Sequence, residues 1–156
     1  MRVALDTNLL VYAEGVAFLP SDMHKPAVAH DLLDAIPSED VVLPAQVLGE
    51  LYRVLTGKAK RPASEVRTAL LNWCDLYAPV DTTAAVMMAA VDLASIHRLS
   101  IWDSVVLSVA AEAGCRLMLS EDMQEGFTWR GLTVVNPFSS SPHPLLSALL
   151  AGKPAS

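Results

Sequence analysis

Arg2-Val3-Ala4-Leu5-Asp6-Thr7-Asn8 is the stretch that decides the fold of this chain. Its first four residues form a short, mostly apolar run with a β-branched member, which is typical of a buried strand. Polar residues follow at once, and Asn8 is suited to cap a helix that begins at Leu9. The stretch therefore predicts a strand that leads directly into a helix.

The same order, an apolar strand and then a helix, recurs along the chain. Val41-Val42-Leu43 precedes Pro44, which suits the first position of a helix reaching Gly57. Short apolar strands separated by helices favour an α/β fold with a parallel sheet covered on both faces. The other elements we expect are helices over 21–36, 62–76, 84–97 and 101–113, and strands over 78–80, 116–119 and 132–135.

Length and composition limit the domain organisation. The chain has 156 residues, of which 53% are hydrophobic and 18% charged, and this predicts one folded domain with a single core. We expect that domain over 1–138. The remaining segment, 139–156, is low in charge and rich in Ser and Pro, and we expect a tail that is flexible or docks on a partner.

Charge and cysteine content narrow the function and the compartment. Eleven Lys and Arg against seventeen Asp and Glu give a net charge of −6, which excludes general binding to nucleic acid by phosphate neutralisation alone. Cys74 and Cys115 lie in apolar stretches without metal-type spacing, as expected of reduced thiols. The first apolar stretch is too short for a leader or an anchor. We therefore expect a cytoplasmic protein without a membrane partner.

Four acids lie where an α/β fold binds ligands, at the carboxyl ends of its strands. Asp6 and Asp122 follow strands, Asp103 begins a helix, and Glu50 leaves an otherwise apolar helix face. Oxygen ligands suit hard cations, so these acids predict a site for one or two Mg²⁺ or Mn²⁺ ions. The alternative is that each acid is an ordinary turn or helix-terminal charge, with Glu50 reaching solvent or Arg53.

Four short motifs, in order and at compatible separations, carry a family resemblance. The chain resembles PIN-domain ribonucleases and, within that superfamily, the VapC-type toxins of type II toxin–antitoxin pairs. The motifs are Leu5-Asp6-Thr7-Asn8, Gln46-Val47-Leu48-Gly49-Glu50-Leu51, Ile101-Trp102-Asp103-Ser104, and Leu119-Ser120-Glu121-Asp122-Met123-Gln124 with Gly126 and Val135-Asn136-Pro137-Phe138 after it.

The resemblance implies a three-layer α/β/α fold and a Mg²⁺- or Mn²⁺-dependent endoribonuclease. It also implies an RNA substrate, a cognate antitoxin and a homodimer. Thr7 and Ser120 occupy hydroxyl positions that support the acidic cluster in such proteins, and Asn8 and Glu121 are further supporting candidates. Whether Glu121 or Asp122 is the fourth acid stays open. The catalytic and metal-holding acids implied are Asp6, Glu50, Asp103 and Asp122.

Binding of RNA by an acidic protein needs local positive charge. Arg53, Lys58, Lys60 and Arg61 lie within nine positions, directly after Glu50, and are candidates for phosphate contacts. Alternatively, they only complement the carboxyl end of their helix. Trp102 and the pair Trp129-Arg130 have the chemistry to stack on unpaired bases, although such tryptophans are more often core or interface residues.

Two other functions fit the same fold class. The first is a Mg²⁺-dependent phosphatase-like or phospho-accepting α/β domain, but Asn8 stands where such a phosphatase needs a second Asp. A receiver domain would also need a lysine after the strand that ends at Leu119. The second is a non-catalytic PIN domain that binds RNA or protein, and it predicts the loss of at least one of the four acids.

Overall fold

Strand β1 (Val3–Leu5) lies in the middle of the sheet, and all three of its residues are buried. It pairs in parallel with β2 (Val41–Pro44) on one side and with β4 (Leu117–Leu119) on the other. The computed structural model describes residues 1–152. Within them the sheet has six strands in the order β3-β2-β1-β4-β6-β5. The remaining strands are β3 (Pro79–Val80), β5 (Thr128–Trp129) and β6 (Leu132–Val135).

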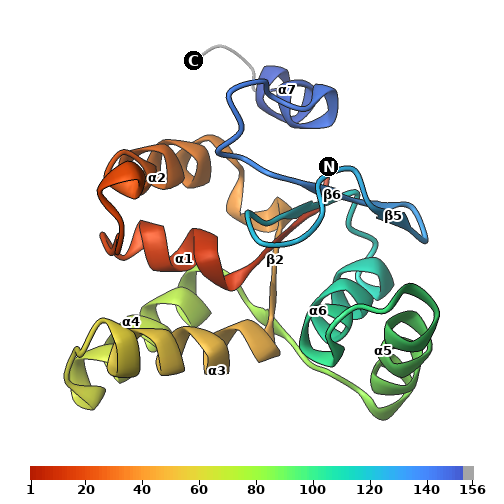
Figure 1. Ribbon diagram of the computed structural model, residues 1–156, viewed down its shortest axis with the longest axis horizontal. Helices are drawn as coiled ribbons and strands as arrows, with labels where there is room; N and C mark the ends of the chain where they lie inside the picture. The colour runs from red at the N-terminus through yellow and green to blue at the C-terminus, as the bar shows by residue number, and fades with distance from the viewer. Residues whose placement is uncertain (153–156) are drawn as a thin grey trace.

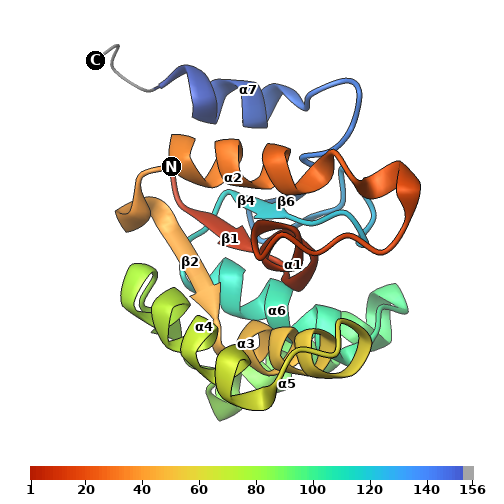
Figure 2. The ribbon, with the colours of Figure 1, turned by 90° about the vertical axis from the view of Figure 1, so that its left-hand side faces the viewer.

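Helices cover both faces of this sheet, which confirms the α/β/α class. Figure 2 shows α2 and α7 above the sheet and α3 to α6 below it, while Figure 1 shows α1 between α2 and α3. Among the described residues, none of the helices combines the length and apolar character needed to cross a membrane. The α-helices are α1 (Thr7–Ala13), α2 (Lys25–Ala35), α3 (Ala45–Arg53), α4 (Ala63–Leu76), α5 (Ala84–His97), α6 (Ile101–Glu112) and α7 (Pro144–Ala151).

The parallel arrangement gathers polar residues at one edge of the sheet. Leu5 and Leu119, the last residues of β1 and β4, are paired in register. The backbone N–H of Asp6 donates to the carbonyl of Leu119 over 3.0 Å, which continues this pairing by one step. Asp6 and Ser120 consequently lie side by side, each directly after the end of a central strand.

The start of α1 differs from the prediction. Asp6, not Asn8, is the N-cap, and the helix begins at Thr7. The carboxylate of Asp6 accepts from the backbone N–H of Thr7 over 2.8 Å, so Asp6 already satisfies the first turn. Asn8 lies within that turn, and its side chain is free to contact residues from the other end of the chain.

Other boundaries shift by smaller amounts. The helix expected over 21–36 is split into a 3₁₀ turn, η1 (Pro20–Asp22), and α2 from Lys25. A second 3₁₀ turn, η2 (Ser38–Asp40), precedes β2. Pro44 ends β2 and caps α3 instead of opening it, and the last part of the helix expected to reach Gly57 is a π-helical turn, η3 (Val54–Lys58).

Strand β5 was not predicted. It forms an antiparallel hairpin with β6, and its turn residues Arg130 and Gly131 both have positive φ, 48° and 82°. A two-residue turn with positive φ matches the twist of a hairpin. The glycine at position 131 was therefore the sequence signal for this hairpin. Trp129 is half-buried, and its ring contacts the Arg130 guanidinium at 4.4 Å.

The segment 139–156 contains helix α7 in its described part. Leu146 is buried and belongs to the same core cluster as β1 and β4. His143 caps this helix through its Nδ1 atom, which accepts from the backbone N–H of Leu145. Docking of this segment on a partner stays a prediction, and residues 153–156 lie outside the described residues.

Candidate active site

Asp6 is the centre of the polar group at the carboxyl edge of the sheet. It is 5% exposed and accepts hydrogen bonds from three directions. Ser120 Oγ donates over 2.6 Å and Asn8 Nδ2 over 3.2 Å, in addition to the backbone of Thr7. The strand ends of β1 and β4 thus hold this carboxylate in one orientation.

Glu50 reaches the same edge from α3. Its Oε2 atom accepts from Thr7 Oγ1 over 2.8 Å, and its Oε1 atom accepts from Gln46 Nε2 over 3.4 Å. Helix α3 is amphipathic, with Val47 and Leu51 buried, and Glu50 is half-buried beside that apolar face. Thr7 therefore connects the acid of α3 to the start of α1.

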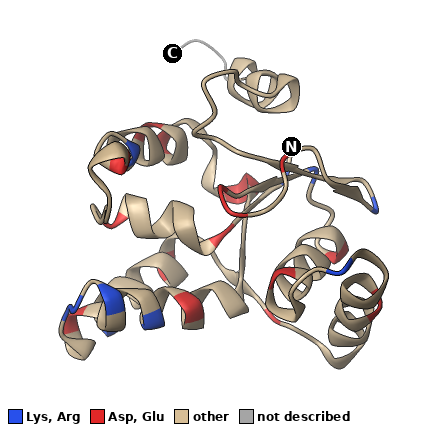
Figure 3. Cartoon of the chain, in the orientation of Figure 1, with Lys and Arg blue, Asp and Glu red and all other residues tan. Residues whose placement is uncertain are grey.

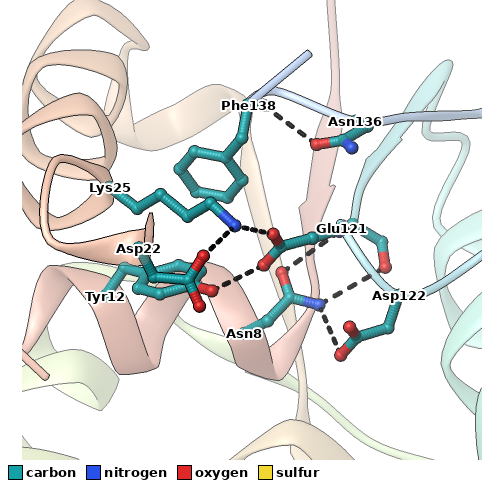
Figure 4. Close-up of polar contacts among 9 residues, drawn as sticks. Asn8, Tyr12, Asp22, Lys25, Glu121, Asp122, Asn136 and Phe138 are labelled. Carbon is teal, nitrogen blue, oxygen red and sulfur yellow. Dashed lines mark hydrogen bonds and ion pairs between the residues drawn. The ribbon is translucent and has the colours of Figure 1, made fainter. Parts of the chain in front are cut away.

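Asn8 connects Asp6 to the loop that follows β4. Its Nδ2 atom donates to Asp122 Oδ2 over 3.2 Å as well as to Asp6, and its Oδ1 atom accepts from the backbone N–H of Glu121 over 3.3 Å. Figure 4 shows the amide between the backbone of this loop and the Asp122 carboxylate. Asn8 and Ser120 therefore bind the acidic groups directly.

Asp103 lies in the first turn of α6 and is half-buried. Ser100 caps the helix by accepting from the backbone N–H of Asp103 over 3.1 Å. Asp103 and Asp122 also line one cavity of about 110 Å³. The α6 acid thus completes a group of four whose members come from β1, α3, α6 and the loop after β4.

The four carboxylates influence one another electrostatically. Burial raises the pKa of Asp6 from 3.8 to about 6, against the lowering effect of the hydrogen bonds from Ser120 and Thr7, and the charges of Asp103 and Glu50 raise it further. Burial also raises the pKa of Asp103, with added repulsion from Glu50 and Asp122. Burial and neighbouring like charges disfavour ionisation, so a cation placed beside Asp6 and Asp103 would stabilise their charged forms.

The donor set fits a hard divalent cation in chemistry and in charge. Carboxylate oxygens are the ligands that Mg²⁺ and Mn²⁺ prefer. Within residues 1–152, however, no three Asp, Glu, His or Cys side chains are arranged to hold an ion as they stand. Asp6 and Asp122 share the amide of Asn8, and Glu50 accepts from Thr7. These hydrogen bonds leave lone pairs on the carboxylates, and the carboxylates would have to move closer together to share an ion.

Glu121 belongs to a different group. Its carboxylate forms an ion pair with Lys25 and accepts from the Tyr12 hydroxyl over 2.7 Å. Lys25 is paired with Asp22 as well, at 2.7 Å. Figure 4 shows the lysine between these two acids, with the ring of Phe138 beside it. Glu121 is consequently paired with a cation that it shares with Asp22, whereas Asp122 contacts the acidic cluster through Asn8.

A cavity of about 360 Å³ opens beside the acids. It is bordered by Thr7, Glu50 and Asp122 on one part of its wall and by Arg53 and Lys58 on another. Figure 3 shows acidic positions where β1 meets α1 and on α3, and basic positions grouped beyond them toward α4. The cavity thus joins two acids of the cluster, Glu50 and Asp122, to two exposed cations, and the Lys25-paired acids Asp22 and Glu121 border it as well.

The four cations of the basic stretch 53–61 lie in different surroundings. Arg53 and Lys58 line the cavity, but Lys60 is exposed and does not. Arg61 Nη1 is ion-paired with Glu14 Oε2 at 2.8 Å, and its Nη2 donates to the Glu14 carbonyl. Only two of the four predicted cations therefore face the acids.

Two further predicted residues lie apart from this cavity. Trp102 is 53% exposed beside Asp103, and Trp129 is on the β5–β6 hairpin; neither belongs to the cavity wall. Sequence reasoning missed Lys25 and Tyr12, and also Phe18 on the cavity wall. None of them lies in a recognisable motif, since their neighbours at the site come from distant parts of the chain.

Fold and site together define a class: an α/β/α domain with an acidic centre at the carboxyl edge of its parallel sheet. The chain belongs to the PIN domain family, whose model matches residues 3–124. A comparison with curated protein sequences finds no match.

Several solved structures share this fold. The sarcin–ricin loop cleaving toxin VapC20 of Mycobacterium tuberculosis is 20% identical, with a TM-score of 0.62 over 77% of this chain and 91% of that one. A toxin–antitoxin complex from Klebsiella pneumoniae is 16% identical, with a TM-score of 0.64 over 87% of this chain and 98% of that one. VapBC2 from Rickettsia felis, bound to a DNA fragment from its promoter, is 16% identical, with a TM-score of 0.64 over 86% of this chain and 97% of that one. At these identities the likeness establishes the fold.

Proposed function

We propose that this protein is a metal-dependent endoribonuclease and the toxin of a toxin–antitoxin pair. The observation that carries the proposal is the group of four carboxylates at the carboxyl edge of a PIN domain. No Lys or Arg of the described residues forms an ion pair with any of the four. The solved toxins that share the fold support the same conclusion.

Asp6, Glu50, Asp103 and Asp122 are the residues that would hold one or two Mg²⁺ or Mn²⁺ ions. Bound there, the ions supply a nucleophile at neutral pH and neutralise charge on the scissile phosphate. The fourth acid in this proposal is Asp122, because Glu121 is already paired with Lys25.

The supporting residues orient the acids. Ser120 and the backbone of Thr7 fix Asp6, while the Thr7 hydroxyl holds Glu50. Asn8 keeps Asp6 and Asp122 within reach of one amide group. Such hydrogen bonds to ligating carboxylates set their orientation and charge, and their loss costs about 10- to 100-fold in metal affinity or activity.

A cognate antitoxin and a homodimer are parts of the same proposal. The Klebsiella structure is described as a toxin–antitoxin complex, which supports the antitoxin. Cys74 and Cys115 are both free thiols, and this supports a cytoplasmic location.

Cleavage of RNA by the purified protein tests the proposal. We expect a panel of folded RNAs to be cut in Mg²⁺ or Mn²⁺ but not in EDTA. Asp6→Asn and Asp103→Asn should each lower the rate by at least about tenfold to a hundredfold, because the loss of a ligand costs no less than the loss of a supporting contact. Asp75→Asn is the matched control, since Asp75 is an exposed acid on α4 and should leave the rate unchanged. Cutting that survives EDTA, or that survives both site variants, would overturn the proposal.

A further inference from the structure

The cavity beside the acids extends well past them. Besides Glu50 and Asp122, its wall contains Phe18 and Leu19, which are 38% and 58% exposed, the exposed cations Arg53 and Lys58, and the acids Asp22 and Glu121, which are paired with Lys25. An apolar wall that carries exposed cations is not needed to hold a metal ion. It has the composition of a surface that binds an aromatic group attached to an anion.

Phe18 and Lys58 form a unit within this wall. The Lys58 ammonium lies 4.1 Å from the centroid of the Phe18 ring, which is the arrangement of a cation–π contact. Within the described residues Lys58 forms no ion pair with a carboxylate, and its side chain is exposed. The ammonium is therefore available to an anion, and the part of the Phe18 ring that the ammonium does not cover is available to a ligand.

The segment that carries Phe18 is fixed from the other side. Glu14 lies at the end of α1, and Gly15 turns the chain there with φ of +79°. Arg61 binds both the carboxylate and the carbonyl of Glu14, and Trp73 Nε1 donates to the same carboxylate over 2.8 Å. The start of the segment that presents Phe18 is thereby tied to α4 and the turn before it.

We propose that Phe18, Lys58 and Arg53 form a subsite for one unpaired nucleotide of the RNA, next to the phosphodiester that is cut. The base stacks on Phe18 and its phosphate lies against Lys58 and Arg53. This inference rests on the proposed ribonuclease function. The cavity volume of about 360 Å³ suits one such unit, since pockets for single small ligands begin at about 300 Å³.

Binding and cleavage are measured separately to test the subsite. A short fluorescent single-stranded RNA is titrated with protein in Ca²⁺, and its cleavage is followed in Mg²⁺ and Mn²⁺. We expect Phe18→Ala to weaken binding about tenfold, because base–aromatic stacking is sequence-tolerant and of that size. In cleavage, we expect the KM of Phe18→Ala to rise by a larger factor than its kcat falls. Phe18→Trp should restore RNA binding and cleavage.

Lys58→Gln and Lys60→Gln form a matched pair from one basic stretch. Lys58→Gln should weaken RNA binding. It should also reduce, by about one counterion, the slope of the logarithm of the binding constant against the logarithm of the salt concentration. Lys60→Gln should do neither, because Lys60 does not border the cavity. Thermal melting of each variant shows that it is folded.

Each outcome separates the subsite from the nuclease. If the wild type cuts RNA and Phe18→Ala binds and cuts like it, the subsite is wrong and the nuclease stands. The subsite is also wrong if Lys60→Gln loses as much binding as Lys58→Gln. If RNA binding depends on Phe18 but neither this RNA nor the folded panel is cut in either metal, the nuclease is wrong and only the binding of a nucleotide at Phe18 stands.

Discussion

Two groups of carboxylates lie next to each other at the carboxyl edge of the sheet, and only one has its own cation. Glu121 and Asp22 share Lys25, and the Tyr12 hydroxyl donates to Glu121. The other group, which includes Asp6 and Asp103, has hydrogen bonds but no ion pair among the described residues.

The difference distinguishes acids that stabilise the fold through an ion pair from acids that are arranged to bind a cation. A charge pair that is removed from water is costly to break because the remaining partner stays unpaired. A group of like charges without a cation is instead destabilised until a cation arrives. Glu121 and Asp122 are adjacent in sequence, so a single peptide unit separates the two arrangements.

The largest expected effect comes from pH on the metal-free protein. The pKa of Asp6 is raised in the folded state from 3.8 to about 6. The Asp6 carboxyl therefore loses its proton at a lower pH in the unfolded chain than in the folded one. Its contribution to stability falls as pH rises from about 4 to about 6, by about 3 kcal/mol at about 1.4 kcal/mol per pKa unit. Urea unfolding in EDTA across this range measures the fall.

Asp6→Asn is the control for that measurement, because an amide does not titrate. The variant should show a flatter dependence over the same range, and Mg²⁺ should lessen the fall in the wild type by binding the ionised form. A wild type whose stability changes from pH 4 to pH 6 in EDTA just as that of Asp6→Asn does would contradict the assignment.

The next effect concerns the paired group. Lys25→Met should lower the free energy of unfolding by about 2 kcal/mol, because it leaves Glu121 and Asp22 partly buried without a cation. The side chains of Lys25 and Glu121 are only 13% and 21% exposed. Urea unfolding at neutral pH is the measurement.

Lys58→Met is the matched comparison, since Lys58 also lies over an aromatic ring but has no ion pair in the described part of the chain. It should change stability by no more than about 0.5 kcal/mol. Equal losses for the two lysine variants would remove the distinction between a structural and a binding cation.

A smaller effect than that of Lys25→Met tests the aromatic side of the paired group. The ring of Phe138 lies 5.0 Å from that of Tyr12, edge to face, and 5.6 Å from the Lys25 ammonium. Phe138→Leu keeps an apolar side chain but removes both contacts, so we expect a loss of about 1 kcal/mol. A double-mutant cycle with Lys25→Met should give a total smaller than the sum, whereas strict additivity would show that the two residues do not interact.

Much of this architecture was predictable because its signals are local. The run from Val3 to Leu5 reads as a buried strand, and Asp6 directly follows it. Once β1 and β4 are parallel, their carboxyl ends must meet at one edge, so Asp6 and Ser120 come together without any long-range information in the motif itself. Motifs of four to six residues were enough to place these two residues, because the direction of the strands brings their ends together.

The remainder depends on contacts between distant segments. Asp6 and Asn8 are both good capping residues, and local preference alone did not select between them. The structure uses Asp6 as the cap, and Asn8 turns to Asp122, 114 positions further along the chain. The neutralisation of Glu121 by Lys25 spans 96 positions, and nothing near either residue signals it.

The most direct test compares Asp103→Asn with Glu121→Gln in Mn²⁺ titration and RNA cleavage on the same preparations. We predict that Asp103→Asn loses both ion binding and cutting, whereas Glu121→Gln retains both, because Glu121 serves Lys25 and not the ion. The opposite pattern, with ion binding and cutting lost in Glu121→Gln and kept in Asp103→Asn, would contradict the division of the acids into a paired group and a metal-holding group.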